Sequence, residues 1–266
     1  MSDSSTSLLD AWSSWTPTTA PFILPADREI LASDRSRRAT TTLTSWEAAR
    51  DAENFEEPGD RRFHLGLLPH PYCGDLRRAS IFVLLLNAGH GPTNYYGEYA
   101  VPEYREALLA TIRQDFTSIP RGHLYFDPRF AWHGGFRWWH GKFAGVIGEL
   151  ATMWSATYAE ARSRFAQSLA SIELIPYHSP KFHDPDRWLS RLQSVRLARD
   201  FVHNSVLPRV LGGEAIVIAT RKVGLWGLPQ HPGVICYDGV QARGAHMTPL
   251  SPGGSEILRF LRTRST

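Results

Sequence analysis

Residues 81–98 read IFVLLLNAGHGPTNYYGE, and this stretch decides the fold. It starts with six apolar residues, reaches Asn87, and continues with glycines, a proline and two tyrosines. A short apolar run bounded by turn-forming residues is typical of a strand buried on both faces of an α/β sheet. In such sheets ligands bind beyond the carboxyl ends of the strands, where Asn87 falls. Asn87 therefore either caps a turn or delivers a polar group into a pocket.

Strand and helix patterns alternate along the rest of the chain. A helical pattern over PEYREALLATIRQDF is followed by the apolar stretch SIELIPYHS, a helical pattern over residues 187–211, the strands GEAIVIATRK and GVICYDG, and a final helix. This order predicts an α/β fold with a mostly parallel sheet that is covered on both sides. We expect residues 1–60 to form an N-terminal helical arm packed on the core, with Ser45 as a helix N-cap, and residues 61–266 to form the α/β domain.

Composition restricts the class of protein. The chain has 266 residues, of which 42% are hydrophobic, and it contains no 18-residue apolar run and no apolar leader. We therefore expect a cytoplasmic protein that does not contact a membrane. Cys73 and Cys236 lack metal-ligand spacing, so neither a metal site nor a disulfide framework is expected. The net charge of +3 permits a polyanionic partner.

A second loop complements Asn87. Residues 246–251 read HMTPLS and lie between the final strand and the final helix. A strand that ends in LNAG and a downstream HMTPLS resemble the two signature loops of the uracil-DNA glycosylase superfamily, whose motifs take forms such as GMNPG and HPSPLS. The resemblance covers about residues 69–261 in the order of elements, and its identities are confined to the two loops. It implies a three-layer α/β/α sandwich with a central four-stranded, mostly parallel sheet.

Two departures from the family pattern affect what the resemblance implies. Ala88 stands where the relatives have proline, so the loop after Asn87 is less rigid. Met247 and Thr248 stand where the relatives have Pro-Ser, which puts a phosphate-pinching serine in doubt. The first motif also lacks the aspartate of the uracil branch, so water positioning would fall to Asn87.

The resemblance implies a monofunctional DNA glycosylase, which flips out a base and hydrolyses its N-glycosidic bond without a metal or cofactor. Asn87 would orient the water and the nucleotide, and His246 would stabilise the negative charge on the departing base. Leu250 would either fill the vacated stack or pack at the entry of the final helix. Thr248, Leu250 and Ser251 are the expected DNA-binding residues.

Five further residues are expected to bind the base. Tyr95 and Tyr96 occupy the region in which some relatives place an aromatic that screens the C5 edge. Tyr177 and His178 end the middle strand, whose counterpart in the superfamily reads the base edge, although His178 could equally be a structural histidine. Glu98 could accept a hydrogen bond from the amino group of cytosine, or serve as a surface or capping carboxylate.

The expected substrate follows from an aromatic segment. Residues 122–146 mix tryptophans, histidines and arginines with glycines, which suits either core packing or stacking against a base or sugar. We therefore expect a bulky modified cytosine, such as glucosylated hydroxymethylcytosine in phage DNA. The alternatives are a repair glycosylase for uracil or another damaged base, an inactive nucleic-acid-binding protein of the same fold, and a hydrolase that uses His246 with Ser251 but lacks a GxSxG motif. The expected partner is DNA, and we expect a monomer without an obligate protein partner.

Overall fold

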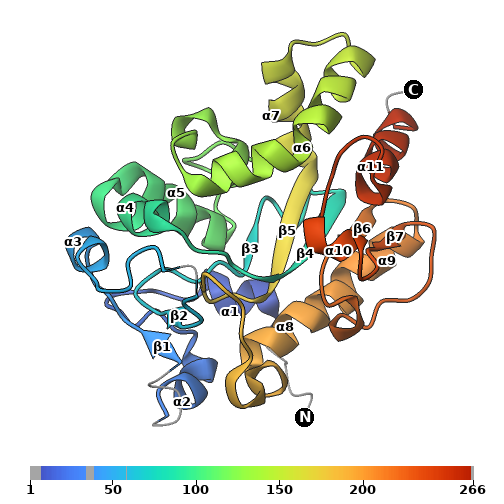
Figure 1. Ribbon diagram of the computed structural model, residues 1–266. Coiled ribbons are helices and arrows are strands. Elements are labelled where there is room, and N and C mark those ends of the chain that lie inside the picture. The colour runs from blue at the N-terminus through green and yellow to red at the C-terminus, as the bar shows by residue number, and fades with distance from the viewer. Residues whose placement is uncertain (1–6, 34–38, 58, 265–266) are drawn as a thin grey trace. The chain divides into compact units, whose positions relative to one another are not determined.

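The computed structural model describes residues 7–33, 39–57 and 59–264, and Figure 1 shows the order of helices and strands along the chain. The chain divides into two compact units. The first consists of Met1–Tyr72, Leu86–Ile119 and Glu173–Val202, and the second of Cys73–Leu85, Pro120–Ile172 and His203–Thr266. The expected arm falls in the first unit, although residues 1–6, 34–38 and 58 lie outside the described part of the chain. The domain boundary at residue 60 stays a prediction.

The main sheet has the strand order β3-β5-β4-β6-β7. Its strands are β3 (Tyr72–Cys73), β4 (Ile81–Asn87), β5 (Leu169–Ile175), β6 (Ile216–Ala219) and β7 (Val234–Cys236). β4 pairs with β6 and β6 with β7, both in parallel. A small parallel sheet joins β1 (Thr40–Thr41) to β2 (Phe63–His64). The expected α/β class is confirmed, and the described main sheet has five strands rather than four.

The additional strand, β3, comes from a segment that contains turn-forming residues. Two prolines, Pro69 and Pro71, precede it. The Glu173 N–H donates to the Pro71 carbonyl at 2.9 Å, and the His70 N–H donates to the Pro176 carbonyl at 2.7 Å. Proline lacks only the donor, so the carbonyls of Pro71 and Pro176 can still accept a ladder hydrogen bond. The segment therefore pairs with the chain at the end of β5 despite its composition.

The first unit contains the N-terminal helices, the first two helices that follow β4, and the first two helices that follow β5. They are α1 (Leu8–Ser13), η1 (Pro25–Asp27), α2 (Arg28–Leu31), α3 (Trp46–Arg50), α4 (Pro92–Ala100), α5 (Pro102–Arg113), η4 (Pro185–Ser190) and α8 (Gln193–Phe201). Ser45 caps α3 by accepting from the Ala48 N–H at 3.0 Å, which confirms the expected N-cap. The expected loop after residue 91 is instead helical, because Pro92 occupies the first turn of α4 and the Asn94 side chain accepts from the Gly91 N–H at 3.0 Å.

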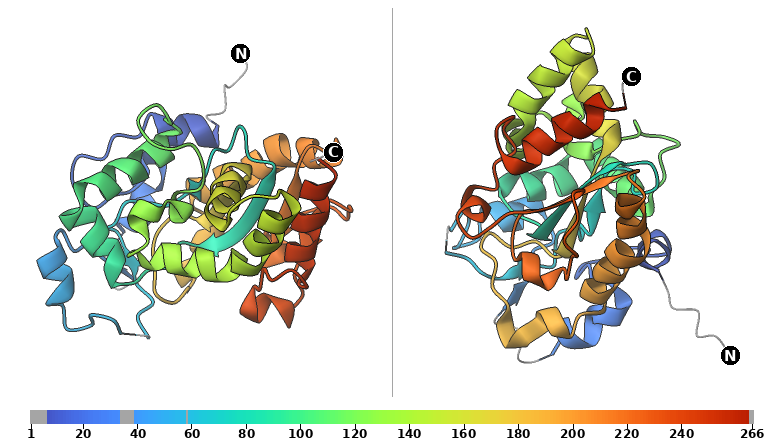
Figure 2. Two further views of the ribbon diagram at one scale, coloured as in Figure 1. Left: turned by 90° about the horizontal axis from the view of Figure 1, so that it is seen from above. Right: turned by 90° about the vertical axis from the view of Figure 1, so that its right-hand side faces the viewer.

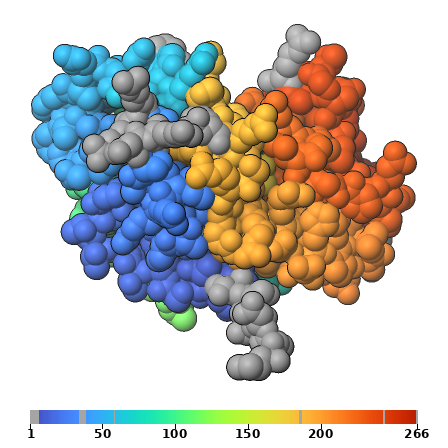
Figure 3. Space-filling view, turned by 90° about the horizontal axis from the view of Figure 1, so that it is seen from below, coloured from blue at the N-terminus to red at the C-terminus, as the bar shows by residue number. Residues whose placement is uncertain are grey.

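A buried hydrogen-bond network joins the N-terminal segment to the chain after β5. The Tyr177 hydroxyl donates to Asp27 Oδ2 at 2.7 Å and accepts from the Leu24 N–H at 3.3 Å. The Ser194 N–H donates to the other oxygen of Asp27 at 3.2 Å. In the space-filling view of Figure 3, the blue N-terminal surface accordingly adjoins the yellow surface of the segment before residue 202. Within the first unit, Leu24 and Asp27 are therefore held to the chain after β5, while the division into an arm and a core stays a prediction.

The second unit contains the remaining helices. They are η2 (Leu124–Phe126), η3 (Pro128–Phe130), α6 (Gly134–Met153), α7 (Tyr158–Ser168), the π-helical turn η5 (Val202–Val206), α9 (Leu207–Leu211), η6 (Val223–Leu225), α10 (Gln241–Gly244) and α11 (Pro252–Arg262). α9 and α11 both contact β6 and lie on different sides of it (Figures 1 and 2). The helix expected over residues 187–211 is divided, because Pro208 has no N–H to continue an α-helical ladder and the chain passes through a π turn.

Candidate functional site

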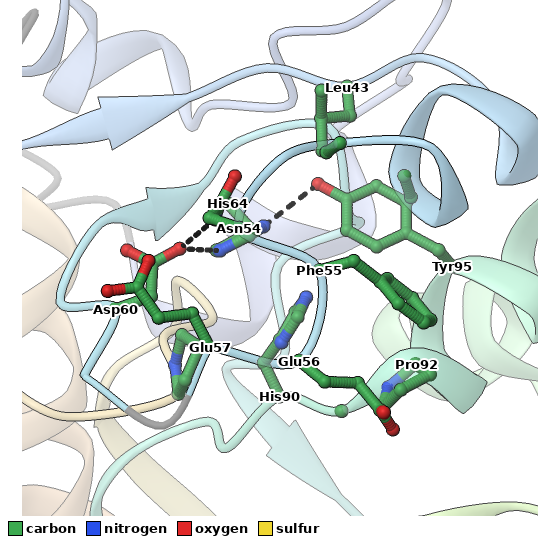
Figure 4. Close-up of a pocket in the computed structure, with 14 residues that line it drawn as sticks. Leu43, Asn54, Phe55, Glu56, Glu57, Asp60, His64, His90, Pro92 and Tyr95 are labelled. Atoms are coloured by element: carbon green, nitrogen blue, oxygen red, sulfur yellow. Dashed lines mark hydrogen bonds and ion pairs between the residues drawn. The ribbon is translucent and has the colours of Figure 1, made fainter.

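A cavity of about 410 Å³ in the first unit is the candidate site (Figure 4). Its volume lies within the range of roughly 300–1,000 Å³ that is typical of small-molecule sites. Its walls come from the end of α3 and the turn after it, from β2, and from the start of α4. The lining residues are Leu43, Ala49, Ala52, Asn54, Phe55, Glu56, Glu57, Asp60, His64, His90, Gly91, Pro92, Tyr95 and Pro180. The chain that leaves β4 at Asn87 therefore enters the cavity wall three residues later.

An aspartate, a histidine and a tyrosine form a hydrogen-bonded chain on one wall of the cavity. His64 Nε2 lies 3.2 Å from Asp60 Oδ2, and His64 Nδ1 lies 3.1 Å from the Tyr95 hydroxyl. Burial alone would raise the pKa of Asp60, but hydrogen bonds and positive charge from Arg62 lower it to about 2. Ionised Asp60 can only accept, so a neutral His64 carries its proton on Nε2 and Tyr95 donates to Nδ1.

A second histidine packs against this chain. The ring centroid of His90 lies 4.0 Å from the ring centroid of His64 and 5.6 Å from that of Tyr95. Burial lowers the pKa of His64 to about 4 and the pKa of His90 to about 3, so both rings are neutral near pH 7. His90 Nε2 is buried and has no hydrogen-bond partner among the residues that the structure describes. A ligand in the cavity could supply that partner.

The turn after α3 brings acceptors and an aromatic ring to the cavity. Glu56 and Glu57 line it as exposed carboxylates, and Phe55 beside them is 37% exposed. The Asn54 amide donates to Asp60 at 2.7 Å, and this contact is drawn in Figure 4. The donors of Asn54, His64 and Tyr95 are used within the wall, while the exposed Glu56 and Glu57 can still accept, so the cavity suits a ligand with N–H and O–H groups.

Asn87 stands at the carboxyl end of β4, close in sequence to this wall. Its Nδ2 donates to the Ala88 carbonyl at 3.0 Å and to Ser179 Oγ at 2.9 Å. Because a carbonyl only accepts, the nitrogen must face Ala88, and this sets the orientation of the amide. Oδ1 takes no hydrogen bond within the described ranges of the chain. The half-buried amide is thus a fixed group with one free acceptor.

His178 holds the loop that follows Asn87. Its Nδ1 lies 2.7 Å from the Gly89 carbonyl and its Nε2 lies 3.1 Å from the Leu68 carbonyl. Burial lowers the pKa of His178, although the two carbonyls favour its protonated form. Both ring nitrogens face the backbone, so the structural interpretation of His178 agrees with its surroundings.

Of the five residues expected to bind the base, only Tyr95 lines the cavity. Tyr96 is 41% exposed and packs edge-on against Trp46, with the ring centroids 5.6 Å apart. The Glu98 side chain is buried and accepts from the Leu68 N–H at 2.7 Å. Tyr177 is bonded to Asp27 as described above. The structure therefore places Tyr96, Glu98, Tyr177 and His178 outside the lining, where the latter three support the backbone.

The HMTPLS loop belongs to the second unit, and its side chains alternate in exposure. His246 and Thr248 are exposed, whereas Met247 is only 2% exposed. The Tyr237 hydroxyl fixes the backbone by donating to the His246 carbonyl at 2.5 Å. Asn87 lies in the first unit, so its expected convergence with His246 on one pocket stays a prediction.

Leu250 and Ser251 end this loop in opposite environments. Leu250 is 96% exposed, so it does not pack at the helix entry, which was the alternative to a wedge role. Ser251 is the N-cap of α11, since its hydroxyl accepts from the Gly254 N–H at 3.1 Å and donates to the Thr248 carbonyl at 2.7 Å. The loop thus exposes the Leu250 side chain to solvent directly before the N-cap of α11.

The sequence interpretation missed Asp60, His64 and His90. His90 lies within the stretch that decides the fold, and its position three residues after Asn87 was the available signal. Asp60 and His64 had no local signal, because Asp60 ends the expected arm and His64 belongs to neither of the two signature loops.

Other kinds of site find little support in the described part of the chain. No group of three or more histidine, cysteine or acidic side chains there could hold a metal ion, and neither Cys73 nor Cys236 forms a disulfide. None of the described helices is long and apolar enough to cross a membrane. Comparisons of the chain with protein-family models, with curated proteins and with solved structures gave no match.

Proposed function

We propose that this chain is a monofunctional DNA glycosylase, which flips out a modified base and hydrolyses its N-glycosidic bond to leave an abasic site. One observation carries the proposal: the loop that starts at Asn87 continues into the wall of a ligand-sized cavity through His90, Gly91, Pro92 and Tyr95. A polar group at a strand end and a pocket formed by the following loop are the two parts that base excision requires.

Asn87 is assigned the positioning of the attacking water. Cleavage of the bond forms an oxocarbenium-like sugar, which is electrophilic enough that the water needs orientation more than a strong base. The free Oδ1 of Asn87 can accept a hydrogen bond from the water, while both hydrogens on Nδ2 hold the amide to Ala88 and Ser179. This fixed orientation supports a positioning role.

The side chains that line the cavity favour a base with hydrogen-bond donor groups as the substrate, rather than uracil. Uracil presents two carbonyl oxygens and needs donors, whereas Glu56 and Glu57 are acceptors and the unpartnered Nε2 of neutral His90 accepts or donates according to its tautomer. An exocyclic amino group and sugar hydroxyls are donors, and a sugar can pack on an aromatic ring such as Phe55. We therefore propose a bulky modified cytosine, such as glucosylated hydroxymethylcytosine, as the substrate.

The resemblance also assigns roles to two residues of the second unit. His246 is assigned the stabilisation of negative charge on the departing base, and Leu250 the filling of the vacated stack. The 96% exposure of Leu250 supports the second assignment, since a leucine that packs in its own fold would be covered.

The test is an abasic-site assay on glucosylated phage DNA, uracil-containing DNA and unmodified DNA. We expect alkali-labile cleavage of the glucosylated DNA, and a rate at least about 100-fold lower for Asn87→Ala, because misplacing the water has a cost of that order. Asn204→Ala is the matched control, since Asn204 is exposed and lies in the second unit. Absence of cleavage on all three DNAs, or equal rates for Asn87→Ala and wild type, would overturn the proposal. Preference for uracil would overturn only the substrate assignment.

A further inference from the structure

One side of α6 carries an exposed aromatic ring next to a cation. Trp138, Lys142 and Gly145 are spaced at i, i+4 and i+7, so they share a side of the helix. Trp138 is 44% exposed, although its neighbour Trp139 is only 5% exposed. The Lys142 ammonium lies 5.3 Å from the centroid of the Trp138 ring, within cation–π range.

The HMTPLS loop is fastened to the same side of α6. Lys142 Nζ donates a hydrogen bond to the Gly244 carbonyl, just before the loop. At the other end, a Cβ on Gly145 would lie only 2.8 Å from Pro249 Cδ, so the absence of a side chain there lets the loop approach the helix. The helix that presents Trp138 therefore also anchors the loop that presents Leu250.

A second cation stands close to Lys142 without a counterion. Burial lowers the pKa of Lys142, and the positive charge of the exposed Arg221, which follows β6, lowers it further. Neither cation forms an ion pair with a carboxylate within the described part of the chain. Two neighbouring positive charges repel each other, and a bound anion would relieve that repulsion.

We propose that Trp138, Lys142 and Arg221 bind a single strand of DNA, with an unpaired base stacked on Trp138 and a phosphate held by the two cations. Aromatic rings that stack on bases, set among cations that follow the backbone, are the features of strand-binding surfaces. A small inorganic anion would contact only the two cations, whereas a nucleotide would also stack on the exposed Trp138 ring. The inference rests on DNA as the partner of the proposed function, and it adds a strand contact in the second unit, outside the cavity of the first.

The experiment measures the binding of a fluorescein-labelled oligothymidylate by fluorescence anisotropy at several salt concentrations. We expect Trp138→Ala to raise the Kd roughly five- to 150-fold, as loss of one stacked base does, and Trp138→Phe to restore most of the affinity. Arg221→Gln should make the slope of log K against log salt shallower by about 0.7, the value for one phosphate contact on a single strand. Arg137→Gln is the matched control, because Arg137 is an exposed cation next to Trp138 on another side of the helix.

The inference would be overturned if Trp138→Ala and Arg221→Gln both kept the Kd and the salt slope of the wild type. It would also be overturned if Arg137→Gln changed these two quantities as much as they do. Tighter binding of a fully paired duplex than of the single strand would also overturn it. Circular dichroism and thermal unfolding test whether the variants fold. We expect them to fold, because the replaced side chains are exposed. Base release by the wild type is measured separately: strand binding through Trp138 without base release would overturn the proposed function alone, and base release without this binding would overturn the inference alone.

Discussion

Glu98 gives the sharpest prediction for the folded state. It lies on α4 with its side chain fully buried, and its Oε2 accepts from the Leu68 N–H at 2.7 Å. Arg105 is the nearest cation, with Nη1 3.9 Å from the carboxylate. Burial outweighs this attraction and raises the pKa of Glu98 from 4.5 to about 8. The folded protein therefore holds Glu98 as a neutral acid at pH 7, whereas the unfolded chain ionises it.

The sign of the pH effect follows from this difference. Because the pKa of Glu98 is higher in the folded state than in the unfolded state, its contribution to the free energy of unfolding is fully present below pH 4.5. This contribution is lost as the pH rises towards 8. From 4.5 to about 8, at 1.36 kcal/mol per pH unit, the loss is on the order of 5 kcal/mol. His64 and His90 act in the opposite direction, because their lowered pKa values favour the fold above pH 6.5. A comparison of two variants is therefore needed to isolate Glu98.

We expect Glu98→Gln to be increasingly more stable than the wild type from pH 5 to pH 8. Glutamine keeps an acceptor for the Leu68 N–H and mimics the neutral acid. Urea unfolding followed by circular dichroism at each pH measures the difference. Glu106→Gln, at an exposed position on α5, is the control and should leave the pH dependence unchanged. A constant difference between Glu98→Gln and wild type over this range would refute the reasoning, and loss of base release in a stable Glu98→Gln protein would instead support a role in reading the base.

Three further changes test separate parts of the structure. Leu250→Ala should change the free energy of unfolding by less than about 0.5 kcal/mol, because the side chain is 96% exposed, yet it should slow base release from duplex DNA more than from single-stranded DNA. Tyr177→Phe should destabilise the protein by about 1–3 kcal/mol in urea unfolding, because the buried Asp27 loses the donor at 2.7 Å; no loss would mean that this contact does not anchor the N-terminal segment. Ser45→Ala should cost about 1 kcal/mol in the same assay through loss of the N-cap of α3, and Ser45→Asp should restore stability.

Local patterns predicted several elements well. The apolar run at residues 81–86 predicted β4, and Ser45 predicted the start of α3, since each signal lies within a few neighbouring residues. The sequence was less informative where two local signals compete. Pro69 and Pro71 are turn-forming residues, but the Pro71 carbonyl accepts a hydrogen bond from the Glu173 N–H of β5. Glycine and aromatic residues after Asn87 likewise indicated a loop, although Pro92 and Asn94 start a helix there.

The amino-acid sequence by itself determined the α/β class and the polar residue at the end of the central strand, because burial of apolar residues and the chemistry of turns act over short distances along the chain. The tertiary structure alone decided which side chains meet in the cavity. His64 and Tyr95 are 31 residues apart and hydrogen bond at 3.1 Å, while Tyr177 and His178, which the sequence assigned to the base, bond to backbone and to Asp27. The reason is that contacts between distant segments depend on how the elements pack, and no pattern of neighbouring residues carries that information.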